Sequence, residues 1–373
     1  MEDFLAQVIK KRGSITFKEF MKLALYHPEY GYYTARQSQL GKVGDFYTSV
    51  HVSPLFGAMM GRQIAEVFNI LSCPPSFIVT EFGAGDGALA YDILTWLEKE
   101  HQDCFQTLTY QIVEISPELR KKQAEALKDY LPRVKWVDSE TLEQAPFEGV
   151  ILSNELIDAL PVHLAKFSQG QWLEAWVSVD SQGKLTQQWE EASQDFSNYF
   201  KLLDWYPKEG QVVEVNFGAL KWLDTVSKAL KKGIVITIDY GYLAQELEQP
   251  HRFDGTLLCY HQHKVVKDPF VNLGEQDMTS HANFTALMKQ GEKNRLKTCG
   301  FMTQAKFLLN LGIMDVVESM SKKDPQEARK QILAVKKLAF PEGMGEIFKV
   351  LIQHKGLEQP QLRCLVPFHK QMR

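Results

Sequence analysis

The chain has 373 residues, of which 45% are hydrophobic and 24% are charged, and this composition excludes a disordered chain, a fibrous repeat and a coiled coil. Its 42 basic and 46 acidic residues give a formal net charge of -4, which argues against nucleic acid as a partner and against a polybasic membrane binder. No window approaches the roughly 18 apolar residues that a membrane span needs. The polar N-terminus lacks a signal-peptide or transit-peptide pattern and the five cysteines are widely spaced, so we expect a cytoplasmic protein with reduced thiols.

Residues 1–75 are predicted to form a helical and loop-rich N-terminal cap. A helix is expected from about Phe17 to Tyr26, with Ser14 as its cap. The aromatic and glycine-rich stretch 27–49 is typical of an ordered loop. A second helix is expected from about Ser53 to Leu71, where apolar residues recur at helical spacing.

Strands and helices alternate in the next part of the chain, with strands expected near 77–80, 109–115, 134–137 and 149–153. This alternation predicts crossover connections and a mostly parallel, Rossmann-like α/β sheet that is covered on both faces. The sheet resumes at the buried strand 233–239, so the core is assigned to residues 76–160 and 231–373. Residues 161–230 are predicted to be an inserted antiparallel hairpin followed by helices, and 240–300 a loop-rich insertion within the core.

A glycine-rich loop is expected between the first strand of this sheet and the following helix. Its sequence is Glu81-Phe82-Gly83-Ala84-Gly85-Asp86-Gly87-Ala88. In this context Gly83 permits a tight turn, Gly85 lets a ligand approach the backbone, and Ala88 lets the helix pack closely. The loop therefore predicts a site for a nucleotide-type cofactor.

The two acids of this loop, Glu81 and Asp86, indicate which cofactor it binds. A dinucleotide would present its pyrophosphate to these carboxylates at the helix N-terminus. S-adenosylmethionine (SAM) has no phosphate and carries an ammonium and a sulfonium. One such charge pair at ~4 Å and an effective dielectric of ~20 gains roughly 4 kcal/mol before desolvation. The acidic loop therefore favours SAM over a dinucleotide.

The next predicted strand ends in Glu114, which is followed by Ile115. An acid at this position can accept hydrogen bonds from both hydroxyls of a ribose. Together with the loop residues Gly83, Gly85 and Gly87, both residues are therefore candidates for binding the cofactor.

Asn154, Glu155 and Asp158 follow the fourth strand. Ligands of open parallel sheets bind beyond the carboxyl ends of the strands, so we expect these side chains beside the cofactor. A helical turn would put Glu155 and Asp158 on one side, where paired carboxylates can clamp a guanidinium. The same pattern also fits a helix start at which the dipole favours acids.

No metal site is predicted. His261-Gln262-His263 and Asp268 lack a third ligand at a diagnostic spacing. Asp239-Tyr240-Gly241 is predicted to end a strand. This segment either contributes to the active site or simply caps the turn that follows the strand.

Motifs typical of one family are spread over nearly the whole chain. They are Tyr26-His27-Pro28 through Tyr33, Gly44-Asp45-Phe46 with Thr48, Glu81 to Gly87, Asn154-Glu155 with Asp158-Ala159 and Pro161, Ile238-Asp239-Tyr240-Gly241, Gly255-Thr256-Leu257, Asp277-Met278-Thr279-Ser280-His281, Gln304 to Gly312, and Met344-Gly345 to Val350. With these motifs the sequence resembles the MidA-like methyltransferases, whose mitochondrial members help to assemble respiratory complex I.

The resemblance implies a class I SAM-dependent methyltransferase core with an N-terminal cap and inserted segments. It implies symmetric dimethylation of an arginine on a complex I subunit of the quinone-reducing arm, or on another protein. It also adds Gly44, Asp45, Phe46 and Thr48 to the candidate cofactor residues, with Phe46 excluding water from the bound cofactor.

Three other functions stay open. One is a SAM-dependent methyltransferase that acts on a small molecule or nucleic acid, although the chain has no basic stripe and no Asn-Pro-Pro-aromatic motif at Asn154. Another is an NAD-dependent oxidoreductase, which Glu81 and Asp86 disfavour. The third is a non-catalytic factor for complex I assembly.

Overall fold

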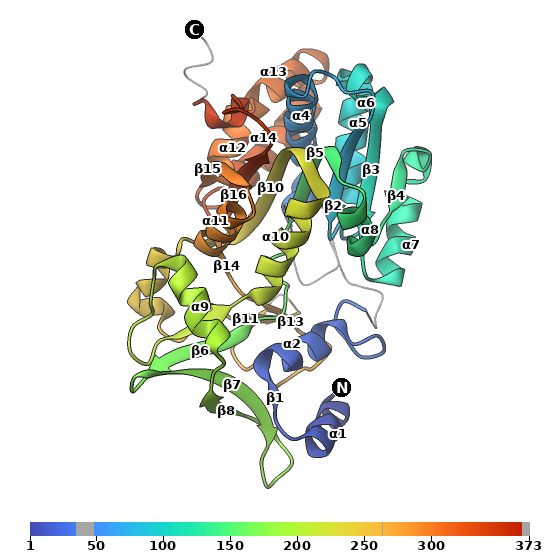
Figure 1. The fold of residues 1–373 in the computed structure, drawn as a ribbon. Coiled ribbons are helices and arrows are strands. Elements are labelled where there is room, and N and C mark those ends of the chain that lie inside the picture. Colours follow the sequence, from blue (N-terminus) through green and yellow to red (C-terminus); the bar gives the residue numbers. More distant parts are fainter. Residues whose placement is uncertain (35–47, 263, 368–373) are drawn as a thin grey trace. The chain divides into compact units, whose positions relative to one another are not determined.

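The computed structural model describes residues 1–34, 48–262 and 264–367 (Figure 1). Within them the chain divides into two compact units. The larger unit consists of residues 48–156, Asp224–Tyr240 and 291–367, and the smaller unit of residues 1–34, Ile157–Leu223 and Gly241–Gln290. The predicted cofactor residues Gly44, Asp45 and Phe46 lie outside the described residues.

The larger unit is built on one sheet, whose strands run side by side in Figure 1 in the order β15-β16-β10-β5-β2-β3-β4. The strands are β2 (Phe77–Phe82), β3 (Leu108–Val113), β4 (Val134–Trp136), β5 (Phe147–Asn154), β10 (Leu230–Tyr242), β15 (Lys297–Thr303) and β16 (Phe348–Lys355). The pairs from β4 to β10 are parallel, and β16 is antiparallel to both of its neighbours. The predicted mostly parallel sheet is therefore confirmed.

The chain enters this sheet in the middle. It begins at β2, moves outward through β3 and β4, and returns to place β5 on the other side of β2. This reversal is a topological switch point, and in open parallel sheets ligands bind in the crevice beyond the carboxyl ends of the strands at such a point. The fold thus directs attention to the segments that follow β2, β3 and β5.

Apolar side chains from both the strands and the helices form the core of the larger unit. Phe77, Val150, Ile236 and Val350 of the sheet are fully buried, because helices cover both faces of a parallel sheet. The helices are α3 (Ser49–Val52), α4 (Leu55–Ile70), α5 (Ala88–Glu100), α6 (Gln102–Thr107), α7 (Pro117–Ala126), α8 (Ser139–Gln144), α12 (Gln304–Asn310), α13 (Ile313–Lys323) and α14 (Pro325–Ala339). Helices α10 (Phe217–Ala229) and α11 (Phe284–Lys293) run from one unit into the other.

The smaller unit contains two antiparallel sheets. One has the order β1-β7-β6-β9 with β8 beside β7, and the other has the order β12-β11-β13. The strands are β1 (Ile15–Thr16), β6 (His163–Ser168), β7 (Gln171–Val179), β8 (Leu185–Glu191), β9 (Val212–Val215), β11 (Leu258–His261), β12 (Lys264–Val266) and β13 (Asp277–Thr279). The short strand β14 (Ala282–Asn283) pairs with the end of β10.

Aromatic and aliphatic side chains also fill the smaller unit, whose helices are α1 (Glu2–Arg12), α2 (Phe17–Tyr26) and α9 (Gln194–Leu203). Trp172 of β7 stacks on Phe200 of α9 with ring centroids 4.0 Å apart. An antiparallel hairpin and helices are thus found in the segment where they were predicted, whereas the domain boundaries drawn from the sequence stay a prediction.

The cap of α2 differs from the prediction. The side chain of Thr16 accepts a hydrogen bond from the Glu19 backbone N–H at 3.2 Å. Ser14 instead accepts one from Gln188 Nε2 at 2.9 Å. An N-cap side chain bonds the backbone two or three residues further on, and Ser14 lies too early to reach the first turn of this helix.

No helix in the described part of the chain is both long and apolar enough to cross a membrane.

Candidate functional site

The glycine-rich loop after β2 lies at the switch point. Gly83, Gly85 and Gly87 have φ values of 69°, 55° and 90°, a region that other residues adopt only under strain. A Cβ built on Gly85 would meet no heavy atom within 4 Å, so the loop leaves open space beside its backbone. A Cβ on Gly87 would lie 3.3 Å from Gln123 Cα in α7. Gly87 therefore lies where a neighbouring helix approaches closely, and the role of Ala88 in helix packing stays a prediction.

Glu81 is the second-last residue of β2, just before this loop, and is almost completely buried, with 2% of its surface exposed. The hydroxyl of Tyr110 donates a hydrogen bond to Glu81 Oε2 at 2.7 Å. Burial raises the pKa of Glu81 to about 7, with the Tyr110 hydrogen bond opposing this shift and the charges of Asp86 and Glu114 adding to it. A cation bound nearby would therefore hold this carboxyl ionised at neutral pH.

Asp86, the second acid of the loop, is engaged by the protein itself. Its Oδ2 lies 2.8 Å from His51 Nε2, and its Oδ1 accepts a hydrogen bond from the Ala88 N–H at 3.1 Å. Burial acts to raise the pKa of Asp86, but the bonds from His51 and Ala88 outweigh it and lower the pKa. Asp86 thus fixes the conformation of the loop. Of the two acids, Glu81 is therefore the better candidate for attracting the cation of a ligand.

His51 is a residue that the sequence analysis missed. Its Nδ1 lies 2.7 Å from Thr48 Oγ1, so Thr48, His51 and Asp86 form a hydrogen-bonded row that ties α3 to the loop. The bond to Asp86 raises the pKa of His51 in spite of burial. No short motif could reveal this contact, because its partners are 35 positions apart in the chain.

Glu114 follows β3 and is also buried. Its Oε1 accepts a hydrogen bond from the Ser116 N–H at 2.8 Å, and its Oε2 accepts one from Gln123 Nε2 at 3.2 Å. Burial raises the pKa of Glu114, and these hydrogen bonds oppose the shift. A carboxylate has about four lone-pair positions, so acceptor capacity remains for the hydroxyls of a ribose. The next side chain, Ile115, is 73% exposed and offers an apolar surface beside this acid.

Asn154 and Glu155 mark the end of β5, on the other side of the switch point. Glu155 has a φ of 53°, which is uncommon outside glycine and is often found at functional sites. Its backbone N–H bonds to the Ile238 carbonyl at 2.9 Å, and Asn154 Nδ2 donates to Glu155 Oε1 at 3.0 Å. These contacts fix both side chains at the carboxyl end of the sheet.

The helical turn considered for Glu155 and Asp158 does not form. The positive φ of Glu155 takes the chain out of the right-handed helical region, and a turn follows in which the Leu160 N–H bonds to the Ile157 carbonyl at 3.3 Å. Asp158 belongs to the smaller unit, where its carbonyl accepts a hydrogen bond from the Ser280 N–H at 3.0 Å.

Two weaker sequence signals have local explanations. Asp239 lies within β10, which continues to Tyr242 and not only to the predicted strand end, and it accepts a hydrogen bond from the adjacent Tyr240 N–H at 2.9 Å. His261 Nδ1 lies 3.0 Å from the Glu275 carbonyl, and His263 lies outside the described residues. Among the described residues, no group of three side chains is arranged to hold a metal ion.

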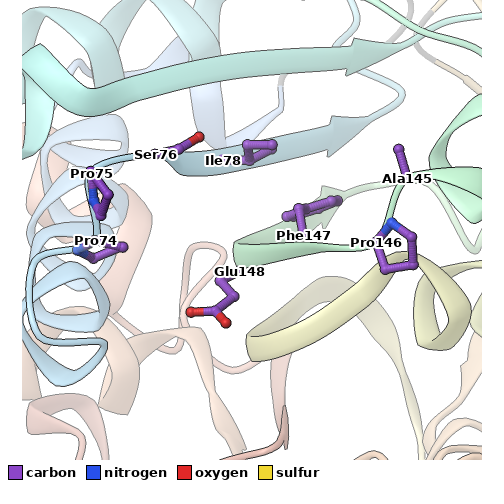
Figure 2. A pocket seen from close by; sticks show the side chains of 8 residues that line it. All are labelled: Pro74, Pro75, Ser76, Ile78, Ala145, Pro146, Phe147 and Glu148. Carbon is purple, nitrogen blue, oxygen red and sulfur yellow. The ribbon is translucent and has the colours of Figure 1, made fainter.

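A cavity of about 470 Å³ lies at the opposite end of the sheet, where β2 and β5 begin (Figure 2). It is lined by Pro74, Pro75, Ser76, Ile78, Ala145, Pro146, Phe147 and Glu148. Its one charged side chain, Glu148, pairs with Lys231 at 3.5 Å. The cavity is therefore separate from the polar groups at the carboxyl ends of the strands.

Fold and site together define an α/β protein whose candidate cofactor site lies at the switch point of its sheet. Residues 59–302 match the model of a family of S-adenosyl-L-methionine-dependent methyltransferases, and this match spans more than half of the chain. The chain belongs to this family.

Similar proteins agree with this assignment. A crystal structure of a protein from Burkholderia thailandensis with S-adenosyl-homocysteine bound is 33% identical, covers 98% of this chain and 94% of its own, and superposes with a TM-score of 0.86. The Drosophila melanogaster protein arginine methyltransferase NDUFAF7 homolog, mitochondrial, is 26% identical over 94% of this chain and 83% of its own length. The human protein arginine methyltransferase NDUFAF7, mitochondrial, is 27% identical over 94% of this chain and 82% of its own.

The protein is thus a SAM-dependent methyltransferase, and the predicted fold class, cofactor and enzyme class are confirmed. Its residues fit this cofactor. The loop leaves open space at Gly85, Glu114 keeps acceptor capacity, and Glu81 adds a carboxyl just before the loop.

Proposed function

We propose that this enzyme methylates arginine nitrogens of a protein and forms symmetric dimethylarginine. The observation that carries this proposal is the similarity over 94% of the chain to proteins named protein arginine methyltransferase. The proposed substrate is a subunit of the quinone-reducing arm of respiratory complex I, or a similar protein. A cytoplasmic location belongs to the same proposal, although the names of these relatives place them in mitochondria.

When bound, SAM supplies an electrophilic methyl group on its sulfonium. In our proposal Glu81 attracts the ammonium group, Glu114 accepts the ribose hydroxyls, and Ile115 packs against the base. The open backbone at Gly85 makes room for the amino-acid part of the cofactor. Gly83, Asp86 and Gly87 shape the loop, and Gly44, Asp45, Phe46 and Thr48 are proposed as further contacts.

Asn154, Glu155 and Asp158 are proposed to handle the arginine. A guanidinium with a pKa above ~12 is a poor nucleophile because its lone pairs are delocalised. The Glu155 carboxylate would clamp the guanidinium by accepting its N–H bonds and hold one nitrogen in line with the methyl group, and Asp158 is proposed as a further residue that binds the arginine. The C–N bond would form as the bond between the methyl carbon and the sulfonium sulfur breaks, which leaves S-adenosyl-homocysteine. The nitrogen would lose a proton to a carboxylate, which passes it to water. Asn154 keeps Glu155 in place through their 3.0 Å hydrogen bond.

The test uses the purified protein, SAM with an isotopically labelled methyl group, and purified complex I subunits of the quinone-reducing arm. Mass spectrometry of the digested subunits then locates dimethylarginine. We expect product with the wild type and none with Gly85→Val, which cannot keep its loop conformation open for the cofactor. We expect Glu155→Gln to lower kcat about 100-fold or more without changing the affinity for SAM.

Glu140→Gln, at an exposed site on α8, is the matched control and keeps full activity. A Glu155→Gln variant that methylates at the wild-type rate would refute the clamp. Intact SAM binding without methylarginine on any subunit would refute the arginine proposal and favour a small-molecule substrate.

A further inference from the structure

Gln123 of α7 joins three parts of the switch-point site. Its side chain is fully buried. Nε2 donates to the Gly85 carbonyl at 2.9 Å and to Glu114 Oε2 at 3.2 Å, and Oε1 accepts from Trp136 Nε1 at 2.8 Å. All three partners lie in the larger unit, at the carboxyl ends of β2, β3 and β4.

The orientation of this amide is fixed by its partners. The indole N–H of Trp136 can only donate, so it must face the amide oxygen. The carbonyl of Gly85 and the carboxylate of Glu114 only accept, so they must face the NH2 group. A flipped amide would set donor against donor and acceptor against acceptor, which removes the ambiguity that Gln side chains usually carry.

We propose that Gln123 is a positioning residue for SAM, which it serves by binding the Gly85 carbonyl and the Glu114 carboxylate with one amide group. The proposal rests on the role proposed above for Glu114 as the acceptor of the ribose hydroxyls. Gln123 itself touches the loop and the acid, and it acts on the cofactor through them. Its two hydrogen bonds fix the separation between the part of the loop that faces the amino-acid end of SAM and the acid that binds its ribose.

The charges around Glu114 make this role measurable. Arg120 of α7 donates from Nε to the Glu114 backbone carbonyl at 2.7 Å and pairs through Nη2 with Asp138 at 2.8 Å, and its charge lowers the pKa of Glu114. Glu81 at the end of β2 is the acid that interacts with Glu114 through its charge. The Gln123 hydrogen bond also lowers the pKa of Glu114 against the effect of burial. Loss of this bond therefore favours the protonated acid, which is a weaker acceptor for the ribose.

Gln123→Met separates hydrogen bonding from packing, because methionine has a similar length and volume but offers no N–H. Calorimetric titration with SAM is carried out at several pH values on the wild type, Gln123→Met, Glu114→Gln and the double variant. Gln144→Met on α8, at an exposed glutamine, is the matched control. Thermal unfolding without SAM shows which variants are folded.

We expect Gln123→Met to raise the Kd for SAM about tenfold, as the loss of hydrogen bonds to a charged group implies. The acid limb of its binding profile moves to higher pH, a change that a loss of packing alone would not produce. In the Glu114→Gln background the same substitution has a much smaller effect, because one of the two acceptors of the Gln123 NH2 group no longer has a charge. Gln144→Met binds like the wild type.

The outcomes distinguish the two proposals. If Glu114→Gln weakens SAM binding but Gln123→Met keeps the wild-type Kd and pH profile, the role of Gln123 is refuted and that of Glu114 stands. If Glu114→Gln binds like the wild type, the role of Glu114 is refuted. If Gln123→Met does not fold, Trp136→Phe decides, because it removes the indole N–H that orients the amide. An unchanged Kd and pH profile in Trp136→Phe would refute the proposal.

Discussion

Burial and partners give two acids of one loop opposite behaviour. Glu81 is buried with a tyrosine hydroxyl as its hydrogen-bond donor, and its pKa rises to about 7. Asp86 has a histidine and a backbone N–H as partners, and its pKa is lowered. The two acids therefore differ in chemical state near neutral pH, which the sequence argument, based on formal charge, treated as equal.

The raised pKa of Glu81 predicts that SAM binding depends on pH. Between the unfolded value of 4.5 and the folded value of about 7, the folded protein holds the extra proton, so stability falls as pH rises through this window. The ammonium group of SAM stabilises the ionised carboxylate of Glu81, so SAM binding favours loss of this proton. We expect SAM affinity to rise about tenfold between about pH 6 and pH 8, since one unit of pKa is worth about 1.4 kcal/mol.

Calorimetry in buffers of different ionisation enthalpy measures the proton released on binding. Glu81→Gln should bind SAM more weakly at pH 8 and lose most of the pH dependence. Two other groups near this site have raised pKa values: the hydrogen bond to Asp86 raises that of His51, and burial raises that of Asp92 to about 7. A Glu81→Gln variant with the wild-type slope would assign the proton to one of these two groups and refute the role of Glu81.

At the residue scale, the sequence predicted the parts of the site that lie within a short motif. Gly83, Gly85 and Gly87 occupy the loop at the switch point, and Glu114 directly follows the neighbouring strand β3. His51 and Gln123 were missed because their partners in the loop are 35 and 38 positions away. The backbone of Glu155 was missed because nothing in the side-chain pattern specifies a positive φ there.

At the element scale, two helices of the larger unit approach closely through small residues. Gly57 and Gly61 lie one turn apart on α4. A Cβ on Gly57 would overlap the Cβ of Asp92 in α5, and one on Gly61 would lie 2.7 Å from Trp96 Cδ1. The close crossing of α4 and α5 therefore needs glycine at these positions, and it contributes to the burial that raises the pKa of Asp92.

We expect Gly57→Ala to destabilise the protein, although alanine is the better helix former by about 1 kcal/mol. Overpacking a tight contact costs about 1–3 kcal/mol, and here the helices have to move apart. Chemical denaturation measures the change in the free energy of unfolding. Asn69→Ala, at an exposed position of the same helix, is the control and should be neutral or slightly stabilising. If Gly57→Ala were as stable as Asn69→Ala, the added methyl group would not overpack the contact between α4 and α5, and the prediction would be wrong.

Elements with a strong local pattern were predicted well. The helix expected from Ser53 to Leu71 is α4, Leu55–Ile70, and the strand expected at 233–239 lies within β10. Short elements were missed, since they exist through pairing with distant residues. Ile15 and Thr16 of β1, for example, pair with Val177 and Trp176 of β7, which no local propensity reveals.

At the scale of the whole molecule, each compact unit is assembled from separate stretches of chain. A reading along the sequence could join the separate stretches 76–160 and 231–373 through the strands of one sheet, and it could identify the hairpin inserted between them. The candidate residues divide accordingly. The glycine-rich loop, Glu114, Asn154 and Glu155 belong to the larger unit, and Asp158 belongs to the smaller one.

This division predicts where SAM stabilises the molecule. A ligand at 100 times its Kd stabilises the states that bind it by about 2.7 kcal/mol. With SAM we therefore expect slower amide hydrogen exchange in the loop 83–87, in 114–116 and in α7. The amides of strands β6–β8 that exchange through local opening of the smaller unit should exchange at nearly the same rate with and without SAM.

Mass spectrometry of peptides with and without SAM measures this difference, and Gly85→Val is the control in which SAM protects no segment. Protection of β6–β8 equal to that of α7 would contradict the prediction, because it would mean that the smaller unit is ordered by the cofactor. Protection confined to the larger unit would assign cofactor binding to that unit and leave the smaller unit, with Asp158, for recognition of the protein substrate.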